Sequence, residues 1–229
     1  MAVCNNLFDM PQPLRRVLCV FAHPDDESFG PGGTIALWAK QGAEIHLLSA
    51  TRGEAGNGPN PKETARIRSE ELNKSGKILG IKKIEFLGFE DGKIGNNDLS
   101  KLEAVITEKM KFFRPDTLLT FNLNGVSGHL DHMAVASATT QSFRKTKIAK
   151  NLYYFTVPNA ISCLNTNYFI YFPEGPDPGE MHEIIDVSSV WDVRLSAMEQ
   201  HQSQAKDVKE IREELESWEQ KECFMVRKR

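Results

Sequence analysis

The sequence predicts an α/β fold, in which an open and mostly parallel sheet carries helices on both faces. Short apolar runs recur along the first two thirds of the chain, and longer segments with helical spacing of their apolar residues lie between them. Strands that alternate with helices in this way build doubly wound sheets. The chain has 229 residues, of which 40% are hydrophobic and 26% charged. This length and composition fit one large globular domain.

The first strand is predicted at residues 17–21, where an uninterrupted apolar run indicates a strand buried on both faces. Residues 34–41 follow as a helix that opens after the Gly32-Gly33 turn and is closed by Gly42. Residues 44–51 are predicted as the second strand. The chain therefore opens with a strand–helix–strand unit, which is right-handed almost without exception.

The alternation continues through the middle of the chain. A charged amphipathic helix is predicted over residues 62–79, with Gly80 as its stop. Ser100 and Glu103 have the spacing of a capping box for a second helix, which ends before Pro115. Asp131 is expected to cap a third helix that begins near His132. The strands between these helices are predicted at residues 83–87, 117–121 and 151–157.

The pattern changes after Pro158. Residues 159–181 contain a cluster of proline and glycine, and we expect them to form a variable flap over the substrate site. Residues 182–187 are predicted as a strand, and residues 189–221 as a charged helix with a break near Gln204. These elements make a small C-terminal β/α extension of a Rossmann-like sheet. Residues 1–13 are expected to be a loose arm, and residues 14–229 a single domain.

The bulk properties limit the partners that we expect. A net charge of -3 gives no electrostatic reason to expect nucleic acid. No apolar run approaches the roughly 20 residues of a membrane-spanning helix, and the N-terminus does not resemble a secretory signal. Four cysteines without C-x-x-C spacing are expected to stay reduced. These features predict a cytoplasmic protein, and they leave a homo-oligomer open.

A dense group of ionisable side chains follows the first predicted strand. His23, Asp25, Asp26 and Glu27 fall within five residues. Neighbouring carboxylates repel one another unless a cation compensates their charge. The segment is therefore either a solvated acidic turn or a metal site.

A second polar loop, Gly128-His129-Leu130-Asp131-His132, lies beyond the fourth predicted strand. Alone, it fits a capped helix start with solvated histidines equally well. In the usual doubly wound order, however, the first and fourth strands are neighbours where the strand order reverses, and ligands bind there. The two loops are therefore predicted to meet. Two histidines and one aspartate suit zinc with a position left for water, while the remaining groups could serve as general base and oxyanion donor.

These two loops resemble those of a known family. Ala22-His23-Pro24-Asp25-Asp26-Glu27, followed about a hundred residues later by Gly128-His129-Leu130-Asp131-His132, is similar to the LmbE-like or PIG-L family of zinc-dependent N-acetylglucosaminyl deacetylases. Weaker similarities at residues 51–54, 88–92 and 201–204 extend the resemblance over most of the chain. The resemblance implies metal ligands at His23, Asp26 and His132, the general base at Asp25, the oxyanion-stabilising histidine at His129, and its orienting residue at Asp131.

Substrate contacts are implied by the weaker similarities. Arg68 resembles an arginine that reaches the substrate, although a solvated helix arginine paired with Glu71 explains it equally well. Asp91 resembles a ligand of a sugar hydroxyl, and a turn aspartate is the alternative. Glu54 is expected to shape the site. The resemblance implies that a small N-acetylated amino-sugar conjugate is hydrolysed with Zn²⁺, or with Fe²⁺, which the same ligand types suit.

Two other functions stay open at this stage. The first keeps the metal but changes the substrate, as in an amidase that acts on a thiol conjugate. The second is a nucleotide-binding module, in which the turn Gly30-Pro31-Gly32-Gly33 would cradle a phosphate at a helix N-terminus. The spacing of this turn matches neither of the common phosphate-loop motifs.

Overall fold

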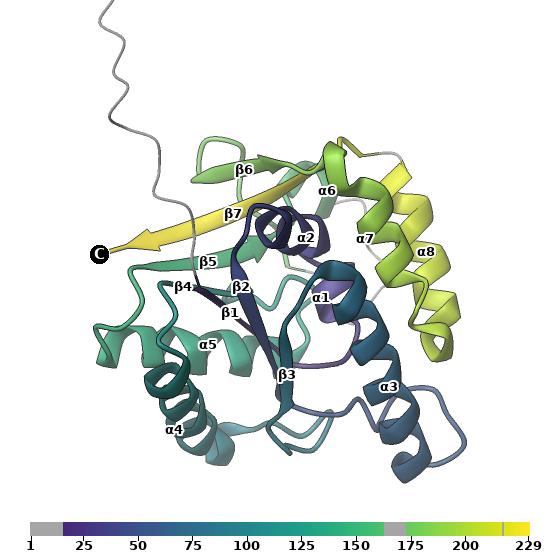
Figure 1. The fold of residues 1–229 in the computed structure, drawn as a ribbon, viewed down its shortest axis with the longest axis horizontal. Helices are drawn as coiled ribbons and strands as arrows, with labels where there is room; N and C mark the ends of the chain where they lie inside the picture. Colours follow the sequence, from purple (N-terminus) through teal and green to yellow (C-terminus); the bar gives the residue numbers. More distant parts are fainter. Residues whose placement is uncertain (1–15, 163–172, 217) are drawn as a thin grey trace, which may run out of the picture.

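The computed structural model describes residues 16–162, 173–216 and 218–229. Within them, a seven-stranded sheet has the strand order β3-β2-β1-β4-β5-β7-β6 (Figure 1). Strand β1 (Arg16–Phe21) lies between β2 (Glu44–Ser49) and β4 (Thr117–Phe121), and both pairings are parallel. The reversal of strand order between β1 and β4 is therefore confirmed. The mostly parallel α/β sheet is confirmed with it.

The two ends of the sheet differ in strand direction. Strands β3 (Lys83–Phe86) and β5 (Asn151–Thr156) extend the parallel part. Strand β7 (Lys221–Lys228) runs antiparallel to β5 and to the edge strand β6 (Glu183–Asp186). Strand β7 was not predicted, because only a short apolar stretch separates its charged ends. The C-terminal extension therefore contributes two antiparallel strands to the same sheet.

Helices cover both faces of the sheet (Figure 1). The alternation of side chains along β1 divides the core, because Val17, Cys19 and Phe21 join one buried cluster whereas Leu18 and Val20 join the other. The second cluster includes residues of α4 (Asn96–Phe113) and α5 (Leu130–Lys145). The first includes residues of α2 (Gly32–Lys40), α3 (Pro61–Leu79), α7 (Trp191–Met198) and α8 (Ala205–Glu216).

The helix boundaries correct several predictions. A one-turn helix, α1 (Asp26–Phe29), precedes α2 and had not been predicted. Helix α4 begins at Asn96, where Asp98 accepts the Gly95 N–H at 3.2 Å, so the capping box at residues 100–103 was wrong. The predicted break in the C-terminal helix is confirmed, since the 3₁₀ turn η2 (Gln202–Gln204) separates α7 from α8. Another 3₁₀ turn, η1 (Ser188–Val190), precedes α7. Helix α8, the second part of the predicted C-terminal helix, ends at Glu216 rather than near residue 221, because the chain turns into β7.

The start of α5 shapes the site directly. His129 is its N-cap, and its Nδ1 atom accepts the Asp131 N–H at 3.2 Å. The prediction that Asp131 caps this helix was therefore wrong, since its carboxylate is engaged with another loop. In the predicted flap, a short helix α6 (Asn159–Ser162) precedes residues 163–172, which lie outside the described residues, as does the predicted N-terminal arm. None of the helices in the described part of the chain has the length and apolar character needed to cross a membrane.

Candidate metal centre and active site

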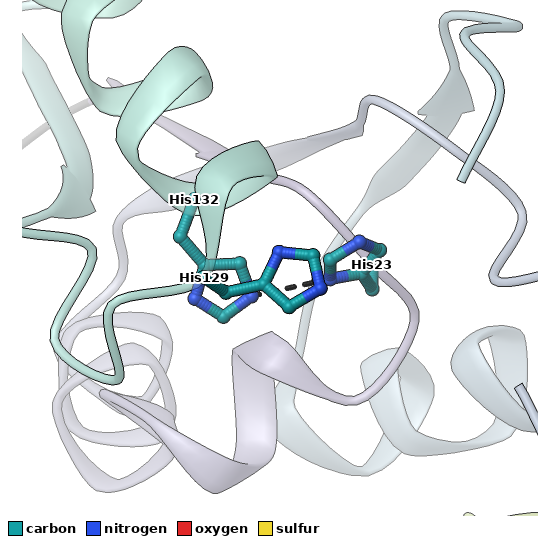
Figure 2. Close-up of side chains that lie close together, drawn as sticks. All are labelled: His23, His129 and His132. Carbon is teal, nitrogen blue, oxygen red and sulfur yellow. Dashed lines mark hydrogen bonds between the residues drawn. The ribbon is translucent and has the colours of Figure 1, made fainter. Parts of the chain in front are cut away.

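Three potential metal ligands converge at the carboxyl ends of β1 and β4. The Nδ1 atom of His23 lies 3.1 Å from Nε2 of His132 (Figure 2). The Asp26 carboxylate closes the triangle, with Oδ1 3.3 Å from His132 Nε2 and Oδ2 3.9 Å from His23 Nδ1. Atoms bound at about 2.0–2.1 Å to one tetrahedral zinc ion lie about 3.3 Å apart. The separations of 3.1 and 3.3 Å match that value, while the 3.9 Å contact to His23 runs to the other oxygen of Asp26. The types of donor therefore suit a metal ion.

His132 is oriented by its own loop. Its Nδ1 atom donates to the Gly125 carbonyl at 3.1 Å, which directs the Nε2 lone pair at the other donors. Its ring stacks on Phe121, with 4.4 Å between centroids. Gly125 has φ 74°, and a β-carbon there would lie 2.9 Å from Cγ of Met133, 3.0 Å from the His129 carbonyl oxygen and 3.3 Å from the β-carbon of His132. Glycine therefore lets this loop pass close behind the imidazole.

Asp26 is oriented by the backbone of the preceding loop. Its Oδ2 atom accepts the N–H groups of Ala22 and His23, at 3.0 and 2.8 Å. The other oxygen faces His132. Burial would raise the pKa of Asp26, but the charges of His132 and His23 hold it well below its usual range. The carboxylate is therefore ready to bind a cation.

The second nitrogen of His23 faces two buried carboxylates. Its Nε2 atom lies 2.9 Å from Oδ1 of Asp91 and 3.2 Å from Oδ2 of Asp131. Burial lowers the pKa of His23, but these carboxylates outweigh burial and raise it to about 10. An imidazole that donates through Nε2 presents Nδ1 as a metal ligand once a cation displaces the Nδ1 proton. Asp91 and Asp131 therefore orient His23 toward the ligand triangle.

Two groups of described side chains have the spacing of metal ligands. One combines His23 with His129 and His132, and the other combines His23 with Asp91 and Asp131. In the second group, Oδ2 of Asp91 accepts the N–H of Ala55. The two carboxylate oxygens of Asp131 accept the N–H groups of Gly92 and Ile94. The second group is thus a hydrogen-bonded support for His23. The first group shares His23 and His132 with the triangle and contains His129 in place of Asp26.

Asp25 lies beside the triangle in a strained backbone conformation, with φ 116° and ψ −29°. Its Oδ2 atom pairs with Nη2 of Arg68 at 2.7 Å. The same guanidinium donates to the carbonyls of Pro24 and Gly53, at 2.6 and 3.0 Å. Burial raises the pKa of Asp25 and the Arg68 charge lowers it, for a net value of about 6. Asp25 is thus a largely buried carboxylate with a pKa near that expected of a general base at neutral pH.

Arg68 is only 5% exposed, so the alternative of a solvated helix arginine paired with Glu71 was wrong. The carboxylate of Glu71 instead accepts the backbone N–H and the hydroxyl of Ser203, at 2.8 and 2.6 Å. A β-carbon at Gly53 would lie 2.5 Å from the Arg68 guanidinium, so this loop also requires glycine. The loop after β2 therefore packs directly on the arginine.

His129 lies next to both histidines of the triangle (Figure 2). Its ring is edge-on to His23 and stacked on His132, with centroids 4.8 and 5.0 Å away. Burial, followed by the charges of His23 and His132, lowers the pKa of His129. Asp131 reaches His129 through its backbone N–H, while its carboxylate contacts His23. The predicted orientation of His129 by the Asp131 carboxylate stays a prediction.

Glu54 joins the loops that follow β2 and β3. Its Oε1 atom accepts the Asp91 N–H at 2.9 Å, and Oε2 accepts the Arg52 N–H at 3.2 Å. Like Asp91 and Arg68, it is engaged within the protein. The substrate contacts predicted for Glu54, Arg68 and Asp91 therefore stay predictions.

The proposed phosphate cradle is already bound by a carboxylate. Glu222 of β7 is 2% exposed, and its two oxygens accept the Gly33 and Thr34 N–H groups at 2.8 and 2.7 Å. Arg194 pairs with the same carboxylate at 3.2 Å. An anion at a helix N-terminus is favourable. The nucleotide-binding alternative thereby loses the site on which it depended.

Comparisons with known proteins identify the family of the chain. A sequence model described as GlcNAc-PI de-N-acetylase (PIG-L) matches residues 18–143, more than half of the chain. A deacetylase of 1D-myo-inositol 2-acetamido-2-deoxy-alpha-D-glucopyranoside from Rhodococcus jostii is 30% identical, over 83% of this chain and 82% of the relative. A probable N-acetyl-alpha-D-glucosaminyl L-malate deacetylase from Bacillus cereus is also 30% identical, over 83% and 84%.

Two further comparisons concern an amidase and a solved structure. A mycothiol S-conjugate amidase from Streptomyces coelicolor is 29% identical, over 56% of this chain and 51% of the relative. The structure of N,N'-diacetylchitobiose deacetylase from Pyrococcus horikoshii has the same fold, with a TM-score of 0.75 at 21% identity over 96% of this chain and 88% of that one. Because the family match covers most of the sheet and both sides of the donor cluster, the chain belongs to the GlcNAc-PI de-N-acetylase (PIG-L) family.

Proposed function

We propose that this chain is a metal-dependent hydrolase that removes the N-acetyl group from an N-acetylglucosamine conjugate. The observation that carries the proposal is the convergence of His23, Asp26 and His132 beside the largely buried carboxylate of Asp25. Family membership supports the reaction type, and the relatives named for inositol and malate conjugates of this sugar support the substrate class.

The proposed metal ligands are Nδ1 of His23, Oδ1 of Asp26 and Nε2 of His132. We prefer Asp26 to His129 as the third ligand, because amide donors already hold its other oxygen and leave Oδ1 facing His132. Zn²⁺ accepts such a set with a position left open, and Fe²⁺ accepts it as well. When bound, the metal would act as a Lewis acid that polarises the substrate carbonyl and lowers the pKa of a water molecule.

Asp25 is the proposed general base. Its carboxylate takes a proton from the attacking water and later delivers it to the nitrogen of the leaving amine, so that acetate and the free amino sugar result. A pKa of about 6 suits both transfers near neutral pH. The ion pair with Arg68 keeps the carboxylate ionised and aimed before the reaction.

His129 is the proposed donor to the oxyanion that forms on the acetyl carbonyl. Its Nδ1 atom accepts an N–H, so the proton of the neutral ring lies on Nε2. The lowered pKa of His129 supports a neutral imidazole as this donor. Losing one such donor typically raises the reaction barrier by about 2.7–4 kcal/mol.

A substrate panel tests this function. Purified protein would be incubated with N-acetylglucosaminides of inositol, malate and a second sugar, and with S-conjugates that carry an amide. Free acetate and free amine would be quantified, and the metal content would be measured on the same sample. We expect acetate release from at least one glucosaminide, with about one transition metal per chain. Turnover of S-conjugates alone would favour the amidase alternative. Stoichiometric metal without turnover of any glucosaminide would contradict the proposal.

A further inference from the structure

The unusual backbone of Asp25 requires a restraint. A φ of 116° is unfavourable for any residue with a β-carbon, and such strain persists only where the surroundings enforce it. The carbonyl of Asp25 already accepts the N–H groups of Ser28 and Phe29, at 3.0 and 2.9 Å. Its own N–H is held separately, by Oε2 of Glu27 at 3.0 Å. The side chain of Glu27 therefore accepts a hydrogen bond from the backbone of the proposed base.

Glu27 is held in turn by two other parts of the chain. Its Oε1 atom accepts the Ser75 hydroxyl from α3 and lies 2.8 Å from Nε2 of His201, which follows α7. Glu27, Ser75 and His201 are all 0% exposed. In the described part of the chain, Nδ1 of His201 is buried without a hydrogen-bond partner, so Nε2 is the atom that ties this ring to the network. Burying such a pair is costly unless its geometry is well satisfied.

The same two parts of the chain are linked a second time. Glu71, on α3, accepts the N–H and the hydroxyl of Ser203, which follows His201 by two residues. Arg68, on α3 as well, holds the Asp25 carboxylate. Both the side chain and the backbone of Asp25 therefore depend on α3, and α3 is fastened to the segment 201–204.

We propose that Glu27 and His201 are positioning residues for the reaction, because together they hold the Asp25 backbone in the conformation that aims its carboxylate at the attacking water. This inference rests on the proposed function. It assigns a role in the reaction to the C-terminal segment 201–204, which lies far from the donor cluster in sequence.

Support of the metal ligand Asp26 is the competing role for Glu27. The Oδ2 atom of Asp26, however, accepts the amides of Ala22 and His23, and its Oδ1 atom faces His132. The contact of Glu27 with this loop is the Asp25 N–H. Loss of the network should therefore lower turnover and leave metal binding intact, which separates the two roles.

Two pairs of variants test the proposal. Glu27→Gln keeps an oxygen that can accept the Asp25 N–H, whereas Glu27→Met has a similar shape without that acceptor. His201→Gln keeps a nitrogen donor near the position of Nε2, whereas His201→Leu removes it. His46→Gln is the matched control, since His46 lies on β2 and stacks on Phe113 at a distance from the site. For each protein, kcat, KM, metal content and the unfolding midpoint would be measured.

We expect Glu27→Met and His201→Leu to lower kcat about 100-fold, because small displacements of a reacting group have effects of that size. KM and metal content should stay within about twofold of the wild type, while the two Gln variants should recover at least about tenfold of the loss. Equal kcat in Met and Gln variants, or loss of metal in parallel with kcat, would overturn the proposal. If Glu27→Met does not fold, the His201 pair decides by the same criteria.

The failure of this inference is distinguishable from failure of the proposed function. A wild-type protein that releases no acetate would overturn the function itself. A wild-type protein that is active, with Asp25→Asn inactive and both Glu27→Met and His201→Leu active at the wild-type rate, would overturn the positioning role alone.

Discussion

Replacing Arg68 by methionine should move the pH dependence of the reaction. Arg68 pairs with Asp25 at 2.7 Å in a site from which water is largely excluded, and the Asp25 pKa of about 6 already includes its opposing effect. A positive charge at this distance typically lowers a carboxyl pKa by about 1–3 units. Without it, the pKa should rise by a similar amount. The base is active when ionised, so the acidic limb of kcat/KM should move to higher pH.

The size of the effect follows from that shift. With a pKa of about 6, about 90% of Asp25 is ionised at pH 7. A rise of about 2 units would leave about 10% ionised, so activity at pH 7 should fall roughly ninefold and recover at alkaline pH. A metal in the site acts on both proteins alike, so the difference between them reports the effect of Arg68.

The assay is a pH profile of kcat/KM for the wild type, Arg68→Met and Arg66→Met. Arg66 lies on the same helix but faces solvent, where it pairs with Glu63 and Glu70. Its loss should leave the profile unchanged, because surface pairs have small effects. An unshifted acidic limb in Arg68→Met would refute the ion-pair account. If KM rose while the limb stayed in place, Arg68 would act on the substrate, as the family resemblance implies.

Three further changes probe the supports of the site. Gly125→Ala should weaken metal binding by about 10–100-fold, measured by chelator competition, because the new β-carbon would crowd Met133 and the His129 carbonyl and shift the loop that orients His132; unchanged affinity would argue against this constraint. Asp91→Asn should weaken metal binding over a similar range through His23, and a raised KM with normal metal affinity would instead indicate a substrate contact. Glu222→Gln should destabilise the fold by about 3–5 kcal/mol in urea unfolding, because it leaves a buried arginine charge unpaired. The kcat of the folded fraction should not change, and a loss of kcat would place this residue in the site.

The location of the site could be predicted from the sequence, because it depends on topology. Strands β1 and β4 are adjacent, so the loops that carry His23 and His132 had to meet at one edge of the sheet. The different roles that we propose for Asp25 and Asp26 could not be read from their spacing. It depends on backbone detail, since amides hold Asp26 while Asp25 takes a left-handed conformation.

Other features were missed because they depend on contacts distant in sequence. Arg66 and Arg68 look alike in the helical pattern of α3, yet Arg66 is solvated whereas Arg68 is buried against the loop that carries Asp25. Asp131 has the sequence position of a helix cap, but the loop after β3 offers its carboxylate two N–H groups. Glu222 resembles a surface charge until α2 is placed beside β7. Local patterns do not contain such partners.

The central claim is that one carboxylate of the acidic turn binds the metal while its neighbour handles the proton. The most direct test measures metal content and acetate release together, on Asp25→Asn and Asp26→Asn prepared in the same way. We predict that Asp25→Asn retains about one metal per chain and loses turnover by at least about 100-fold, whereas Asp26→Asn loses the metal itself. If Asp25→Asn hydrolysed the substrate at nearly the wild-type rate, or if Asp26→Asn kept its metal with undiminished affinity, the assignment would be contradicted.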